Sequence, residues 1–456
     1  MSASVAFEDG LAPAQRRFAM LGIALAVLLS VLDYAVVNVA LPSIARSIQC
    51  TDSAAIWITN AYQLVSLIAL LPVAALGDKI GHARMCRIGL VLFVLASALC
   101  ALSRSLPELA AARALQGLGG ACILGVNAAL LRHIYPSNML GRAIALNGLV
   151  IGLGVALGPT IAAAVLAVAS WPFLFYINLP LGAAALWFAI TALPVTPCWP
   201  RAFDYISAAL LACAFGALII GGDRFAHDGS AVLSLALIGV GAVSLLLLVL
   251  RQLGRPEPLL PVDLLARGGF AAAFTTSFTG FVASNFFMIS MPFALMSVLH
   301  RGPVATGLLI TPWPVAIVVV APFVGPLADR YPAAVLSSIG LCITAIGFFL
   351  LRTMPANPND FAIAWRIFIA GAGFGLFQPP NNKAMLTTAP LNRTGGASGM
   401  ISVARLLGQT VGGMLVALTL GLVHPAPTRT CLTLATATAL LAAVISVARP
   451  RKAQLS

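Results

Sequence analysis

Long apolar runs, separated by short stretches rich in polar residues, Pro or Gly, repeat along almost the whole chain. A helix needs about 20 apolar residues to cross the roughly 30 Å hydrocarbon core of a bilayer, and Pro, Gly and charged residues mark the turns between such helices. The pattern predicts an all-α integral membrane protein. We expect fourteen transmembrane helices, at residues 18–40, 54–76, 84–103, 107–131, 141–167, 171–193, 204–221, 231–250, 270–298, 306–328, 333–352, 360–385, 396–421 and 430–448.

Composition agrees with this pattern. The 456 residues are 60% hydrophobic and only 9% charged, with a mean hydropathy of +1.01, so the chain would be insoluble as a water-soluble globular domain. The first seventeen residues include Glu8 and Asp9 and lack a short apolar region before a small-residue cleavage site. We therefore expect no removable signal, and the first helix itself directs insertion.

The net charge of +13 would suggest nucleic acid as a partner if the protein were soluble. The distribution of Lys and Arg indicates otherwise. If the N-terminus is cytoplasmic, 17 of the 26 basic residues fall on the cytoplasmic side and only six lie outside, which is the positive-inside bias. The basic residues therefore encode orientation, with no nucleic-acid partner. We expect a multi-pass protein of the bacterial cytoplasmic (inner) membrane, with both termini cytoplasmic.

Sequence motifs for metal binding and for enzyme catalysis are missing. The eight cysteines show no metal-ligand spacing. The chain also has no phosphate-cradling P-loop, HExxH pair or G-x-S-x-G elbow. We expect neither a metal site nor a cofactor, and neither an enzyme nor an ATP-driven pump.

An internal repeat organises the chain. Asp78-Lys79 follows the second helix, and Asp329-Arg330 follows a similar helix 251 residues later. An Arg comes after each acid at similar spacing, with Arg113 35 residues after Asp78 and Arg366 37 residues after Asp329. Such repeats are typical of transporter folds. The repeat predicts two similar six-helix bundles related by pseudo-twofold symmetry.

The domain organisation follows from the repeat and the predicted helices. We expect a cytoplasmic segment at 1–17, an N-terminal bundle at 18–193, an inserted helix pair at 204–250, a C-terminal bundle at 270–448 and a cytoplasmic tail at 449–456.

Seven short segments carry further information: Leu32-Asp33, Val37 to Pro42, Gly77 to Gly81, Arg113 to Gly117, Gly154 to Pro159, Trp171 to Gly182 (WPFLFYINLPLG) and Arg405 to Gln409. They resemble motifs of the fourteen-helix drug:proton antiporters of the major facilitator superfamily. The resemblance extends from about residue 20 to 420. The chain departs from the family motifs in the first loop, at Ala74, His82 and Ala83, and after the acid of the first helix, at Ala35.

This resemblance implies export of drugs by alternating access, driven by a proton gradient. Gly154, Gly158 and Pro159 match a segment that this family associates with export rather than uptake, and small residues there allow close helix approach and a bend. Acids at helix ends suit conformational latches. The expected gating residues are Gly77, Asp78, Arg84, Gly154, Gly158, Pro159, Asp329 and Arg330.

Asp33 is the unusual residue of the first helix. At 1.5 Å per residue, it lies about 22 Å from a cytoplasmic start near Phe18, and Arg113, entering from the other face near Pro107, lies at about 21 Å. An ionised carboxylate in lipid is costly, so it must be paired, protonated or hydrated. We expect Asp33 to carry the transported proton and Arg113 to tune it. The alternative is a purely structural Asp–Arg pair.

Other polar and aromatic side chains fall near the same depth. Asn60, Tyr62 and Gln63 can orient a substrate, or merely join helices. Phe286, Phe287 and Trp313 can stack on an aromatic cation, or simply pack. Arg366 and Arg405 have no acid at their depth, which favours a structural role. The expected substrate-binding residues are Asp33, Asn60, Tyr62, Gln63, Asn285, Phe286, Trp313 and Arg366.

Three functions remain open. The first is a monomeric proton-driven exporter of amphipathic, cationic drugs. The second is a narrower exporter of a metabolite or natural product, anions included, because three intramembrane arginines, Arg113, Arg366 and Arg405, outnumber the one buried acid. The third is a membrane sensor or scaffold that transports nothing. The expected partners are a small-molecule substrate, protons and the lipid bilayer.

Overall fold

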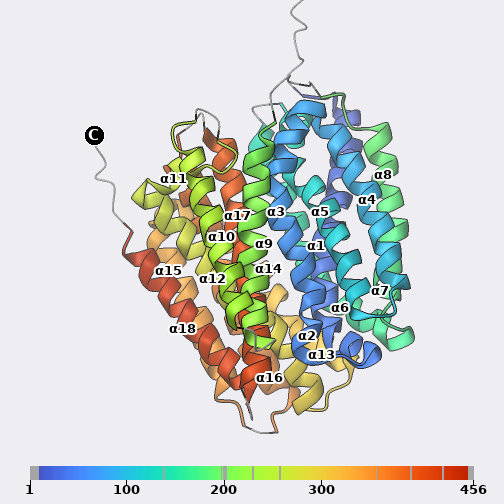
Figure 1. Ribbon diagram of the computed structural model, residues 1–456, viewed down its shortest axis with the longest axis vertical. Coiled ribbons are helices and arrows are strands. Elements are labelled where there is room, and N and C mark those ends of the chain that lie inside the picture. Colours follow the sequence, from blue (N-terminus) through green and yellow to red (C-terminus); the bar gives the residue numbers. More distant parts are fainter. Residues whose placement is uncertain are drawn as a thin grey trace, which may run out of the picture.

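A computed structural model describes residues 10–136, 139–196, 198, 203–227, 231–255, 258–355, 357–390, 393–423 and 426–449. Within these ranges the chain is helical and contains no strand. Fourteen of the described helices are long and apolar enough to cross a membrane, and they run side by side along the long axis of the molecule (Figure 1). The expected all-α fold with fourteen transmembrane helices is confirmed.

The helices fall into three consecutive groups. The first half contains α1 (Pro13–Ile48), α2 (Asp52–Ala55), α3 (Trp57–Ile80), α4 (His82–Leu102), α5 (Leu106–Ile134), α6 (Leu140–Val168), α7 (Phe173–Tyr176) and α8 (Asn178–Thr191). The middle pair is α9 (Tyr205–His227) and α10 (Ala231–Gln252). The second half contains α11 (Val262–Leu265), α12 (Gly268–Phe293), the π-helix η2 (Ala294–Val298), α13 (Pro303–Ile310), α14 (Pro312–Arg330), α15 (Ala333–Arg352), α16 (Asp360–Thr388), α17 (Thr394–Leu422) and α18 (Pro427–Val447).

The helix ends differ from the sequence expectation in two ways. α1 has 36 residues, because a hydropathy window does not detect the polar turns that continue a helix into the interface. Three expected helices are each broken into two, at Ile56, Ile177 and Thr311. Pro312 begins α14 at such a break, where proline's missing N–H is not needed for an intrahelical hydrogen bond.

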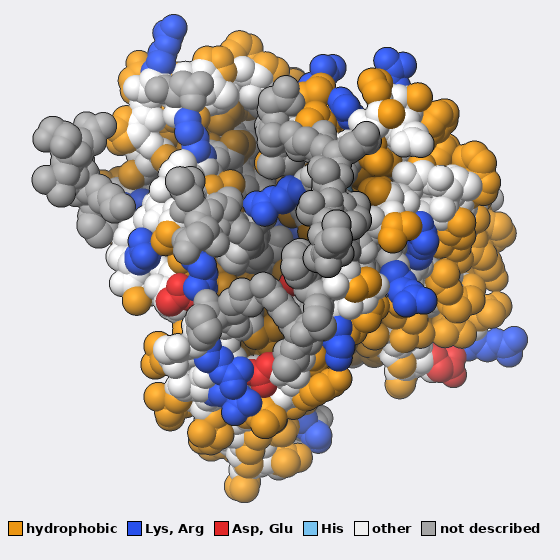
Figure 2. All heavy atoms as spheres, turned by 90° about the horizontal axis from the view of Figure 1, so that it is seen from above, with side chains coloured by type: hydrophobic (Ala, Val, Ile, Leu, Met, Phe, Trp, Pro, Cys, Tyr) orange, Lys and Arg blue, Asp and Glu red, His pale blue; other side chains and the backbone are white. Residues whose placement is uncertain are grey.

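Two ends of the molecule can be defined from α1. The Pro13 end is where α1 begins, and the Ile48 end is where it finishes. The Leu11 N–H donates to the Ile134 carbonyl over 3.0 Å, so α5 finishes at the Pro13 end. Helices α2 and α13 lie at the opposite, Ile48 end (Figure 1). Figure 2 looks onto the Pro13 end and shows Lys and Arg side chains spread over this face, with hydrophobic side chains between them and around its edge.

Packing joins the groups in a regular way. In the first half, α1 packs on α6 and α8, and α5 packs on α3 and α4; in the second half, α12 packs on α17 and α18, and α16 packs on α14 and α15. The halves meet through α1 with α12, α3 with α17, and α6 with α13. Helices α9 and α10 pack on each other, and α9 contacts both α3 and α17. The middle pair therefore lies along the junction of the two halves.

Candidate functional site

Asp33 lies in a sealed polar network inside the first half. Its carboxylate is paired with the Arg113 guanidinium of α5, and the two side chains are 1% and 0% exposed. The Gln116 side-chain amide donates to Asp33 Oδ1 over 2.8 Å, and the Asn178 amide donates to the same oxygen over 2.7 Å. Helices α1, α5 and α8 thus meet at a single carboxylate.

Further contacts hold these groups in place. Arg113 Nη1 donates to Gln116 Oε1 over 2.6 Å, and Arg113 Nε donates to the Ile58 carbonyl over 3.0 Å. Gln116 also donates to the Ser97 hydroxyl over 2.9 Å. Buried charges are tolerated when they are paired and hydrogen-bonded. Arg113 thus contacts both the Asp33 carboxylate of α1 and a backbone carbonyl of α3.

An aromatic ring covers the arginine. The Tyr62 ring centroid lies 4.4 Å from Arg113 Cζ, and the Phe175 centroid lies 5.8 Å from it. Tyr62 is buried, and its hydroxyl donates to the Ser30 carbonyl over 3.4 Å. The ring faces add a cation–π attraction that helps to compensate the guanidinium for lost water.

This geometry limits what Asp33 can do. All three of its neighbours are hydrogen-bond donors, which suits an ionised carboxylate because it accepts and never donates. The two oxygens of a carboxylate offer about four lone-pair sites, so these three donors leave about one site for a proton. Protonation there would weaken the attraction between Asp33 and Arg113.

Sequence reasoning missed three members of this network. Gln116 is three residues after Arg113, so the two share a helix face, and that spacing was a usable signal. Asn178 belongs to the WPFLFYINLPLG segment, which was recognised as a motif without a role for its Asn. Ser97 lies in an apolar run of α4, and no sequence signal distinguishes it.

A second polar cluster lies where the two halves meet. The Tyr34 hydroxyl of α1 donates to Asn285 Oδ1 of α12 over 2.9 Å, and Asn285 Nδ2 donates to the Gln409 carbonyl of α17 over 2.5 Å. Tyr34 also lies near Gln63 and Arg405. The expected residues Asn285 and Gln63 thus come together with Arg405.

The aromatic residues expected to bind substrate pack inside the second half. Trp313 is 2% exposed, and its ring stacks on Phe287 and Phe348 with centroids 5.0 and 5.8 Å away. Phe286 is likewise buried. Their described contacts are those of a helix-packing core.

Arg366 is not part of either polar cluster. Its Nη1 donates to the Ala362 carbonyl of its own helix over 2.5 Å, and its Cζ lies 4.4 Å from the Trp365 ring centroid. No described contact links Arg366 to Asp33.

The residues expected to gate conformational change at the helix ends make few described contacts. Asp78 Oδ1 lies 3.0 Å from His82 Nε2, and a side chain at Gly77 would approach Val126 to 2.8 Å. Arg84 and Arg330 are exposed. The side chain of Asp329 lies outside the described part of the structure.

Small residues bring α6 close to α1. A Cβ added at Gly158 would lie 2.3 Å from the Ala35 Cβ, and one at Gly154 would lie 3.1 Å from Val31. A Cβ added at Gly307 of α13 would lie 2.6 Å from the backbone oxygen of Pro159. A Cβ added at Gly148 would have nothing within 4 Å, so α6 makes no such close approach at that position.

Side-chain hydrogen bonds between the halves are unevenly distributed. Arg46 donates to the Met296 carbonyl over 3.1 Å, and Ser53 donates to the Ala417 carbonyl over 2.8 Å. The hydroxyls of Thr160 and Thr311 lie 3.2 Å apart. These bonds lie toward the Ile48 end. Among the described residues, no such bond joins the two halves nearer to the Pro13 end than Tyr34.

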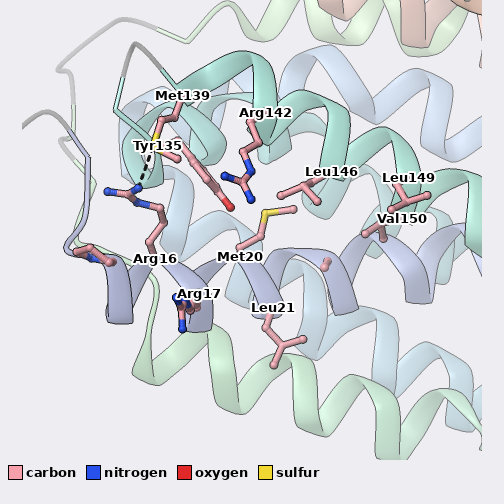
Figure 3. A pocket seen from close by; sticks show the side chains of 12 residues that line it. Arg16, Arg17, Met20, Leu21, Tyr135, Met139, Arg142, Leu146, Leu149 and Val150 are labelled. Atoms are coloured by element: carbon pink, nitrogen blue, oxygen red, sulfur yellow. Dashed lines mark hydrogen bonds between the residues drawn. The ribbon is translucent and has the colours of Figure 1, made fainter. Parts of the chain in front are cut away.

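One cavity of about 490 Å³ lies away from both clusters, at the Pro13 end between α1, α5 and α6 (Figure 3). Arg16, Arg17 and Arg142 lie at this cavity together with apolar side chains such as Met20 and Leu149. It contains none of the residues expected from sequence to bind substrate or protons.

Comparison with known families decides the class of protein. The sequence profile of the Major Facilitator Superfamily matches residues 23–413 and, in a second match, 272–455. The chain belongs to this superfamily. It is 46% identical to Uncharacterized transporter YebQ of Escherichia coli (strain K12), over 97% of this chain and 98% of that protein.

Other Major Facilitator Superfamily relatives are less similar. Multidrug resistance protein Stp of Mycobacterium tuberculosis is 30% identical over 84% of this chain and 71% of its own length. Riboflavin transporter RibZ of Clostridioides difficile is 26% identical over 87% of each chain. The superfamily membership expected from the motifs is confirmed, and the chain is a multi-pass membrane transporter of a small molecule rather than an enzyme.

Proposed function

We propose that this chain is a monomeric proton-coupled antiporter that exports amphipathic small molecules by alternating access across a bacterial cytoplasmic membrane. Both termini would be cytoplasmic, in keeping with the excess of Lys and Arg that the positive-inside rule requires on that side. A multidrug resistance protein among the relatives supports export of drug-like compounds, and the riboflavin transporter supports a narrower substrate range.

The observation that carries this proposal is the Asp33 network. Asp33 is a buried acid whose oxygens accept from Arg113, Gln116 and Asn178. Proton binding would remove the charge that attracts Arg113 and release one donor, so it would loosen α1 from α5 and α8. Such a local change can bias the rocking of one half against the other, which is what a proton-coupled transporter needs.

Bonds between the halves support alternating access. In the described conformation they lie at mid-helix and toward the Ile48 end, including Arg46 to Met296 and Ser53 to Ala417. These bonds would have to break when the molecule opens toward that end. We infer that the described conformation is the state closed to the outside.

Proton flux in reconstituted vesicles tests the proposal. With an acid interior and the dyes rhodamine 123 and fluorescein as candidate substrates, dye addition should release protons through the wild-type protein. Asp33→Asn should abolish this release. The matched control is Asp360→Asn, which removes an acid that is 62% exposed and paired with Arg301. Unchanged proton release in Asp33→Asn would exclude Asp33 from the mechanism, and failure to move any solute would favour the sensor or scaffold function.

The charge of the substrate separates the first two functions. An ionised Asp33 would suit a cationic drug, yet its oxygens already accept hydrogen bonds from donors within the first half. Arg405, in contrast, has no acidic partner among the described residues and lies beside the junction of the halves. This observation favours the second function, export of a substrate that carries an anionic group.

A further inference from the structure

Arg405, in the middle of α17, is a cation that has no counter-ion within the part of the chain that the structure describes. Among the described residues it makes neither a hydrogen bond nor an ion pair, and its side chain is only half-buried. Its charge acts on the hydroxyl groups of Tyr34 and Tyr62. Arg405 precedes Gln409 by four residues and therefore shares the helix face that accepts the Asn285 amide. The guanidinium thus points to the junction between α1, α3, α12 and α17.

Two side chains of α3 beside this junction are also incompletely bonded. Gln63 is 0% exposed, and among the described residues neither its amide nitrogen nor its amide oxygen has a hydrogen-bond partner. Asn60, one turn earlier, has a buried oxygen without a donor. A Cβ at Gly413 of α17 would lie 2.2 Å from that oxygen, so this face of α3 lies directly against α17. A buried polar group that lacks a hydrogen-bond partner destabilises the conformation that contains it.

We propose that Arg405 and Gln63 form a subsite for the anionic group of an amphipathic organic acid. The guanidinium offers two parallel N–H donors to a carboxylate or sulfonate, and Gln63 Nε2 offers another donor. Gln63 Oε1 can accept from a hydroxyl of the same ligand. One occupant would thereby supply the missing counter-ion and the missing hydrogen bonds. This inference rests on the proposed transport function and assigns its substrate class.

Other arginines do not fit this role equally well. Arg113 is neutralised by Asp33, and Arg366 donates to a carbonyl of its own helix. Near Arg405 no described acid competes for the charge. A cationic ligand would be repelled by the charge of Arg405. A cation–π attraction to a nearby aromatic ring would not offset this repulsion while the guanidinium lacks an anionic partner.

Two dyes with the same three-ring frame and opposite charge test the subsite. Full-length protein in phosphatidylcholine nanodiscs is titrated with fluorescein, an anion, and with rhodamine 123, a cation, and binding is followed by fluorescence anisotropy. Arg405→Gln should weaken fluorescein binding by at least ~10-fold, the loss of one charge-assisted hydrogen bond. Rhodamine 123 binding should stay within about twofold, which also shows that the variant is folded. Arg405→Lys should restore part of the affinity because it restores the charge.

Several results would overturn the subsite. These are equal loss of both dyes in Arg405→Gln, no loss of fluorescein, no fluorescein binding by the wild type, or a larger fluorescein loss in Arg366→Gln. Arg352→Gln, which removes a positive charge at the end of α15, is the control. The experiments distinguish an error in the proposed subsite from an error in the proposed transport function. If Asp33→Asn keeps gradient-driven dye movement, proton coupling at Asp33 is wrong, whereas the Arg405 binding result stands on its own.

Discussion

The Tyr62 ring packs over the Arg113 guanidinium, with its centroid 4.4 Å from Arg113 Cζ. The Tyr62 hydroxyl also interacts electrostatically with Asp33 and with Arg405. Tyr62 therefore responds to charge both at the buried Asp33–Arg113 pair and at Arg405. A change of charge at Asp33 is expected to be felt at Arg405.

A first prediction is whether loss of the Asp33 charge strengthens or weakens anion binding at Arg405. Loss of the Asp33 charge leaves the nearby positive charge of Arg113 uncompensated, which favours an anion at Arg405. Asp33→Asn, which mimics the protonated acid, should tighten fluorescein binding in nanodiscs by about 2- to 5-fold. A proton at Asp33 then does not oppose an anion at Arg405 electrostatically. Antiport of the two must therefore come from the rearrangement of the two halves. Weaker fluorescein binding in Asp33→Asn would contradict this electrostatic link.

A second prediction concerns stability. Arg113→Gln leaves Asp33 buried without its cation, and breaking such a pair from one side costs about 3–5 kcal/mol. The thermal midpoint in detergent should fall clearly. In the double variant with Asp33→Asn no unpaired charge remains, so most of the loss should be recovered. Additive losses in the double variant would show that the two side chains do not stabilise each other.

Helix approach at Gly158 gives a third prediction. Gly158→Ala places a Cβ 2.3 Å from the Ala35 Cβ, so α6 must move away from α1 at a cost of about 1–3 kcal/mol. Dye export and the thermal midpoint should both fall. The matched change Gly148→Ala meets nothing within 4 Å and should be neutral. Equal behaviour of the two variants would rule out close packing as the role of Gly158.

The fourth prediction tests whether the halves rock apart. The Thr160 and Thr311 hydroxyls lie 3.2 Å apart across the halves, close enough for a disulfide with small adjustments. Oxidation of the Thr160→Cys, Thr311→Cys variant should arrest dye transport, and a reductant should restore it. Each single variant serves as a control. Continued transport by the fully cross-linked protein would mean that this contact does not open.

A fifth prediction concerns pH and the middle helix pair. Burial opposes ionisation of Asp204, yet hydrogen bonds from Ser207 and the charges of Arg251 and Arg255 lower its pKa to about 2. A lowered folded pKa stabilises the fold above the ordinary carboxyl range near 4, and this stability is lost as pH falls from about 4 to 2. Asp204→Asn should lower the thermal midpoint at pH 7 by about 1–3 °C.

Comparison across pH checks this assignment. The difference in thermal midpoint between wild type and Asp204→Asn should shrink below about pH 4 and be mostly lost near pH 2. At that pH Asp204 is protonated in the unfolded chain and about half protonated in the folded protein. A difference that stays constant from pH 7 to pH 2 would show that the charge of Asp204 does not stabilise α9 against α10.

The sequence predicted how deep a side chain lies along its helix, but it did not predict which neighbouring helix that side chain faces. Asp33 and Arg113 were expected at one level because a helix rises by a constant amount per residue, and the two side chains do meet. Asn178 and Ser97 also reach this site, but nothing in their local sequence states which neighbour they face. Arg366 and Arg405 looked alike in sequence, and only the rotation of α16 and α17 against their neighbours distinguishes them.

By itself, the sequence determined the membrane environment, the number of spanning helices and the superfamily, because apolar length and short motifs are properties of consecutive residues. Tertiary structure alone decided which polar groups share a partner. Those contacts join residues as far apart as Tyr34 and Asn285, and they depend on how each helix is rotated and packed. Two consequences of that packing are the pairing of Asp33 with Arg113 and the position of Arg405, which has no ionic partner among the described residues.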